Sequence, residues 1–76
     1  MEISEKDAER LQKVGLRIKE LRLKAGFTSY ENFAIQHDID RKYYWSIEKG
    51  RNISLQYLFR LLDIHKITPE EFFRGF

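Results

Sequence analysis

The side chains best suited to molecular recognition lie in the stretch 40–49. On a helical wheel of about 100° per residue, Tyr44 and Ile47 fall on one face of this stretch. The opposite face carries Arg41, Lys42, Trp45, Ser46 and Lys49, with Tyr43 at its flank. A short helix with two leading cations, an aromatic ring and a hydroxyl on its outer face can lie in the major groove of DNA.

A pair of short helices joined by a tight turn must hold this face in position. Residues 29–37 carry apolar residues at helical spacing, which predicts the first helix of the pair. Asp38 tolerates the left-handed backbone that a turn needs, and Asp40 is a good N-cap for the helix that follows. We therefore expect the outward-facing helix at Asp40–Glu48, followed by Gly50 and a polar loop.

A long helix is predicted ahead of this pair. Ser4 begins it and Gly26 ends it as a C′ residue. Its apolar stripe comprises Ala8, Leu11, Val14, Ile18, Leu21 and Ala25. Gly15 lowers helix propensity by about 1 kcal/mol relative to alanine, so we expect the first turns either to form a separate segment or to fray. Thr28 or Ser29 caps the next helix: Thr28 forms a capping box with Glu31, and Ser29 with Asn32 is the weaker register.

Two helices are predicted after the pair. Ser54 caps the fourth, and its core positions are Leu55, Leu58, Leu61, Leu62 and His65. Thr68 and Pro69 begin a fifth helix of little more than one turn. The chain then presents Phe72, Phe73 and Phe76. At least one of these rings belongs in the core, but so short a helix cannot bury all three, so they form a candidate dimer seam. The helix before Gly15 is the alternative seam.

Composition indicates one domain, 1–76, with residues 1–13 as an N-terminal helical extension. The chain has 76 residues, 42% of them hydrophobic, and lacks cysteine, which excludes disulfides and thiolate zinc sites. It contains no membrane-length apolar run, and the acidic start, Glu2 to Glu9, is unlike a signal peptide, so we expect a cytoplasmic protein. The net charge is only +2, but cations gather in 13–24 and 41–51. Such blocks suit a polyanion, although they can also simply solvate a helix face.

Five short helices with a tight central pair resemble the lambda-repressor-like, Xre-type helix-turn-helix family. The resemblance covers about residues 14 to 73 and depends on an ordered set of segments. These are Gly15-Leu16-Arg17-Ile18-Lys19-Glu20-Leu21-Arg22, Phe33-Ala34, Ile39 with Tyr44, Ile47-Glu48-Lys49-Gly50, Ser54-Leu55 and Ile67-Thr68-Pro69-Glu70-Glu71-Phe72. The resemblance implies an all-α, five-helix DNA-binding domain whose helix-turn-helix is formed by helices two and three.

The resemblance also implies roles for individual residues. Its base-reading positions fall on Arg41, Lys42, Trp45 and Ser46, and its phosphate-backbone positions on Arg17, Tyr30, Tyr43, Arg51 and Asn52. Its structural ion pair falls on Arg22 and Glu48. The chain departs from the family pattern where Tyr30 replaces a glutamine, Asp38 replaces a turn glycine and Trp45 replaces a polar residue.

We expect a transcriptional regulator that binds double-stranded DNA as a homodimer on a (pseudo)palindromic operator. One alternative is an antitoxin whose DNA binding a toxin modulates; another is a module that uses the same fold and its aromatic surface to bind a protein. His37, Asp38 and Asp40 could suggest a metal or nuclease site, but packing, turn and capping roles explain them better. We therefore expect no metal, no cofactor, no catalytic residue and no membrane contact.

Overall fold

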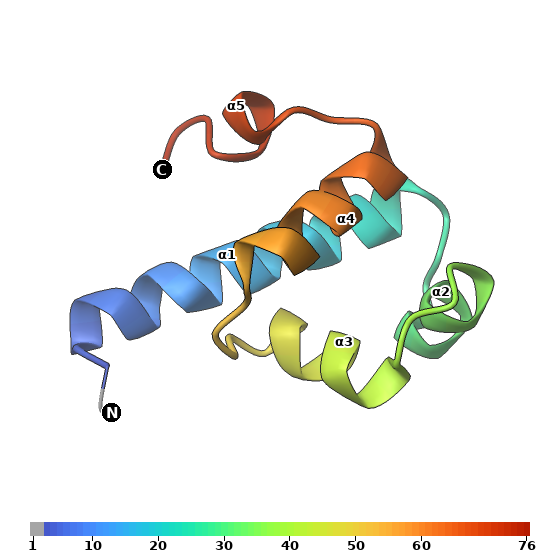
Figure 1. Cartoon of the computed structure of the whole chain (residues 1–76), viewed down its shortest axis with the longest axis horizontal. Coiled ribbons are helices and arrows are strands. Elements are labelled where there is room, and N and C mark those ends of the chain that lie inside the picture. The colour runs from blue at the N-terminus through green and yellow to red at the C-terminus, as the bar shows by residue number, and fades with distance from the viewer. Residues whose placement is uncertain (1–2) are drawn as a thin grey trace.

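The computed structural model describes residues 3–76 and confirms the all-α prediction. Its five helices are α1 (Glu5–Lys24), α2 (Tyr30–Gln36), α3 (Arg41–Glu48), α4 (Leu55–His65) and α5 (Pro69–Phe72). In Figure 1, α3 lies along the lower edge and α5 along the upper edge, with α1 and α4 between them. The N-terminal half of α1 extends past the other helices. Residues 1 and 2 of the predicted domain lie outside the described residues.

Side-chain caps begin these helices, each at a residue that the sequence offers as a cap. Ser4, Asp40, Ser54 and Thr68 each accept a hydrogen bond from a backbone N–H in the first turn that follows. Of the two candidate caps of α2, the structure selects Ser29, whose Oγ accepts from the Asn32 N–H at 3.2 Å. The Thr28 carbonyl instead accepts from Arg22 at 2.9 Å, which holds Thr28 in the loop before the helix.

One hydrophobic core joins the helices. It consists of Val14, Ile18, Phe33, Ala34, Ile39, Tyr44, Ile47, Leu58, Leu61, Leu62 and Phe72. Tyr44 and Ile47 are therefore core residues, as predicted. One predicted core position is wrong, since Leu55 is 67% exposed. Leu55 lies in the first turn of α4, at the end of the apolar stripe of that helix.

Gly15 does not interrupt α1, which runs unbroken as one 20-residue helix. The glycine is there because α3 ends directly against it. A Cβ atom at this position would lie 2.6 Å from the backbone oxygens of both Ile47 and Glu48. The glycine lowers the helix propensity of α1, but it allows a contact between the backbones of α1 and α3 that a larger residue would prevent. The other two predicted backbone features are confirmed, since Gly26 has φ 94° and Asp38 has φ 56°.

A buried ion pair locks the same end of α3 to α1. Arg22 Nε donates to Glu48 Oε2 at 2.7 Å, and Nη2 donates to Oε1 at 3.2 Å. The residues are only 4% and 8% exposed. The Nη1 atom of Arg22 donates to the carbonyls of Phe27 at 2.8 Å and Thr28 at 2.9 Å. The hydrogen bonds to Glu48 raise the pKa of Arg22, so the guanidinium stays charged.

We predict that Glu48→Ala lowers the free energy of unfolding by about 3–5 kcal/mol, because it strands the buried Arg22 guanidinium without its partner. The control is Arg10→Ala, which breaks the exposed pair of Arg10 and Asp7 at 3.2 Å and should cost less than about 1 kcal/mol. Urea denaturation measures both losses. Equal losses for the two variants would contradict the prediction.

His65, which ends α4, is held against the aromatic core. Its ring stacks on Phe33 with 5.3 Å between centroids and 7° between planes. Its Nε2 atom is buried and has no hydrogen-bond partner among residues 3–76. Burial lowers the pKa of His65, and the nearby His37 lowers it further. The fold therefore favours the neutral imidazole.

This burial predicts a loss of stability in acid. An unfolded histidine binds its proton near pH 6.5, whereas folded His65 binds it only at lower pH, so the unfolded state gains protons first. The contribution of neutral His65 to the free energy of unfolding is therefore present above about pH 6.5 and is lost as the pH falls toward the folded-state pKa. We expect His65→Leu to lose less stability than the parent between about pH 7 and pH 5, measured by urea midpoints. Equal losses would show that His65 does not contribute.

Candidate nucleic-acid interface

The outer face of α3 is open, as the sequence predicts. The side chains of Arg41, Lys42, Trp45 and Lys49 are exposed, while Tyr43 and Ser46 are half-buried. The inner face is held by the core and by the Arg22–Glu48 pair, so these outward side chains stand on a fixed support. The arrangement combines cations with a large apolar ring, which can bond base edges and contact a thymine methyl group.

Trp45 does not fold over Tyr44. It is 44% exposed, and its ring leans on Tyr30 of α2 with 5.9 Å between centroids. Lys49 Nζ lies 5.1 Å from the centre of the Trp45 ring. This contact between a cation and an aromatic ring keeps an ammonium group beside the indole on the outward surface.

The first and last of the predicted base-reading residues are already engaged within the chain. Arg41 Nη1 donates to Glu31 Oε2 at 3.1 Å. Ser46 Oγ donates to the Tyr43 carbonyl at 2.6 Å, one turn back in α3. The Ser46 hydroxyl therefore uses its proton inside the helix and offers a base only its acceptor oxygen.

The loop after α3 carries two predicted backbone-contact residues, Arg51 and Asn52, both exposed. The Arg51 guanidinium lies 4.9 Å from the centre of the Tyr43 ring. Tyr43 in turn packs edge-on against Tyr57 with 4.7 Å between centroids. Burial raises the pKa of Tyr57 to about 12, and the hydroxyl of that residue has no hydrogen-bond partner among residues 3–76. Arg51 therefore lies against a pair of packed tyrosine rings.

The structure does not bring Arg17 to this surface. Gly15 faces α3, and a residue two positions later on a helix points about 200° away. The Arg17 Nη1 atom accordingly donates to the Phe72 carbonyl, and the guanidinium lies 4.7 Å from the centre of the Phe76 ring. Arg17 thus anchors the C-terminal segment, on the side of α1 opposite α3 (Figure 1).

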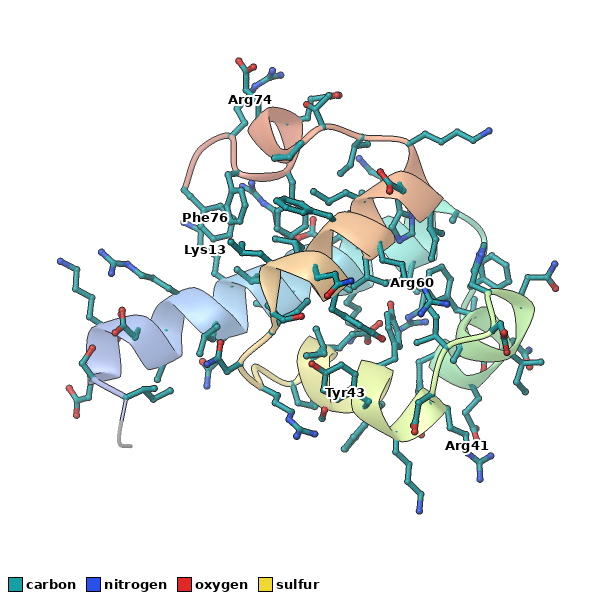
Figure 2. All side chains as sticks on the ribbon, in the orientation of Figure 1. Lys13, Arg41, Tyr43, Arg60, Arg74 and Phe76 are labelled. Carbon is teal, nitrogen blue, oxygen red and sulfur yellow. The ribbon has the colours of Figure 1, made fainter. Side chains whose placement is uncertain are left out.

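The candidate dimer seam is only partly at the surface. Phe72 is 2% exposed and belongs to the core of its own chain, which meets the expectation of one buried ring and removes Phe72 from the seam. Phe73 and Phe76 remain exposed, with Lys13 and Arg17 against Phe76. Figure 2 shows Phe76 and Lys13 side by side above α1.

Sequence reasoning missed one residue of this surface, Glu31. It placed Lys49 on the outer face but did not predict the contact of Lys49 with Trp45. The first turn of α2 lies next to the start of α3, but ten positions separate Glu31 from Arg41 along the chain. A signal was available, since Glu31 is the one acid in the first turn of α2, beside a cationic surface. The sequence does not give the geometry of the turn, which is what brings Glu31 next to Arg41.

Within residues 3–76 there is no group of three or more histidine, cysteine, aspartate or glutamate side chains placed to hold a metal ion. None of the helices in that range is long and apolar enough to cross a membrane.

Comparison with known proteins places the chain in a family. No family model and no solved structure matches it. The control protein C.MunI of a Mycoplasma species is 45% identical to it over 60 residues, which are 78% of this chain and 81% of that protein. The similarity therefore extends over most of both chains, including the helix pair. This chain belongs to the control-protein family of helix-turn-helix regulators.

Proposed function

We propose that this protein is a sequence-specific DNA-binding transcription regulator of the lambda-repressor-like, Xre type. It acts from the cytoplasm as a homodimer on a (pseudo)palindromic operator. The observation that carries the proposal is the exposed face of α3, with Arg41, Lys42 and Trp45 on a helix whose other face is locked into the core. The control-protein relative supports a regulatory role.

Base reading falls to the outward face of α3. Arg41 and Lys42 donate to guanine O6 and N7, and Arg41 does so in bidentate geometry. Trp45 packs on a thymine methyl group or a sugar, and the Ser46 oxygen accepts from a base amino group. These are the contacts that distinguish one sequence from another.

Phosphate contacts come from the edges of the same surface. Arg51 and Asn52 follow α3, while Tyr30 and Tyr43 flank it. These residues fix the register of α3 on the duplex without reading sequence. We leave Arg17 out of the interface, because its guanidinium is bound to the C-terminal segment.

Selection of bound sequences from random duplex DNA tests the proposal directly. We expect a palindromic consensus, with half-sites about 34–36 Å apart as a two-fold dimer requires. Binding should weaken steeply with salt, as phosphate neutralisation demands. Failure to enrich any sequence, with binding that is insensitive to salt, would reject a DNA-binding function.

We predict a division of labour between the two groups of residues. Arg41→Ala or Lys42→Ala should cost about 1–3 kcal/mol on the selected operator and relax preference at one base position. Arg51→Ala should weaken binding to all sequences alike and lower the salt slope by about one. Arg17→Ala is the control and should leave the slope unchanged. Titrations at several salt concentrations measure this, and equal losses on operator and random DNA for Arg41→Ala would contradict it.

We place the two-fold seam on α4. Leu55 and Phe59 lie four residues apart, so they share one helix face, and they are 67% and 47% exposed. Phe76 belongs to the dimer seam that the sequence predicts, but Lys13 and Arg17 lie against its ring. A two-fold contact there would set like charges against each other.

We predict that Phe59→Ser weakens the homodimer while the monomer still folds, because it removes apolar area from a surface residue. Phe76→Ser is the matched variant from the rival seam and should leave the association constant unchanged. Sedimentation of free and DNA-bound protein measures both. Weakening by Phe76→Ser alone would place the seam at the C-terminal segment, and a strictly one-to-one complex on a single half-site would reject the dimer.

A further inference from the structure

Glu31 places a negative charge within the proposed base-reading surface. Its Oε2 atom accepts from Arg41 Nη1 at 3.1 Å, and both side chains are about half exposed. Figure 2 shows Arg41 reaching outward at the start of α3, next to α2. An acid at this point repels phosphate, so a surface that only needed to hold DNA tightly would be better without it.

The position of Glu31 in its helix explains only part of why an acid is found on this surface. Glu31 lies in the first turn of α2, where a carboxylate is favourable near the positive helix end. That benefit does not require a bond to Arg41, which belongs to the next helix. The pairing spans the turn and constrains a side chain that otherwise has several rotatable bonds.

The bond leaves Arg41 able to read a base. A guanidinium has five N–H donors in one plane, and Glu31 takes up a donor on Nη1 only. The edge formed by Nε and Nη2 remains available for the two acceptors of a guanine, O6 and N7. The carboxylate can therefore hold the guanidinium plane while its opposite edge bonds the base.

We infer that Glu31 is a positioning residue that sets how sharply Arg41 discriminates guanine from other bases. This rests on the proposed function. Two effects act together. The carboxylate opposes binding of any duplex through its charge, and it favours guanine by orienting Arg41. Removing Glu31 therefore strengthens binding to random DNA and weakens the preference for the correct base.

Two substitutions separate charge from orientation. Glu31→Gln keeps the size of the side chain and removes the charge, whereas Glu31→Asp keeps the charge and withdraws the carboxylate by one methylene. The control is Glu70→Gln, an exposed acid on α5 at the opposite edge of the molecule from α3 (Figure 1), which makes the same change in net charge. Each variant is titrated with the selected operator, with that operator altered at the base pair read by Arg41, and with random duplex.

For Glu31→Gln we expect affinity for random duplex to rise about two- to fivefold, and discrimination at the altered base pair to fall by a similar factor. Glu31→Asp should lose discrimination without the gain on random DNA. Glu70→Gln should change binding to all three duplexes by one common factor. In an Arg41→Ala background, Glu31→Gln should no longer affect discrimination, since it acts through Arg41.

The outcomes keep this inference apart from the proposed function. If the parent protein shows no sequence preference, the proposed function fails, and the role of Glu31 fails with it. If the parent discriminates and Glu31→Gln discriminates equally well, only the inference is overturned. A loss of discrimination that persists in the Arg41→Ala background would also overturn it, because Glu31 would then act on the DNA directly.

Discussion

The contact between Arg22 and Glu48 is the constraint on which the rest of this small fold depends. The Arg22 guanidinium joins three segments: α1 that carries it, the loop carbonyls of Phe27 and Thr28, and the end of α3. Burying two charges is costly, and such a pair adds little net stability over well-packed apolar side chains. Its value here is geometric, because bidentate bonds admit one orientation of α3 on α1.

Around that fixed helix, aromatic rings order the long cationic side chains. Lys49 lies against Trp45, and Arg51 lies against Tyr43, which is itself packed on Tyr57. Side chains held in this way lose less conformational freedom when they meet a ligand. In a chain of 76 residues, the same aromatic side chains therefore pack on their neighbours and order the cations of this surface.

Much of this could be predicted from the sequence, because caps and apolar spacing are local signals. The local signals correctly indicate the helix starts, the left-handed turn residue and the core face of α3; the starts are at Ser4, Asp40, Ser54 and Thr68. The ion pair of Arg22 and Glu48 joins distant residues and was implied by the family resemblance. The features that local spacing did not indicate share a different cause. The direction of Arg17, the exposure of Leu55 and the contact of Glu31 depend on which helix packs where, and spacing along one helix does not contain that information.

The glycine at position 15 has a mechanical consequence for recognition. At this point two backbones touch, with the carbonyls of Ile47 and Glu48 against α1 and no side chain between them that could repack. The buried Arg22–Glu48 pair fixes the same end of α3. Because a backbone contact and an ion pair both hold this end, the helix has little room to shift on α1, and any adjustment of fit falls on the partner that α3 meets.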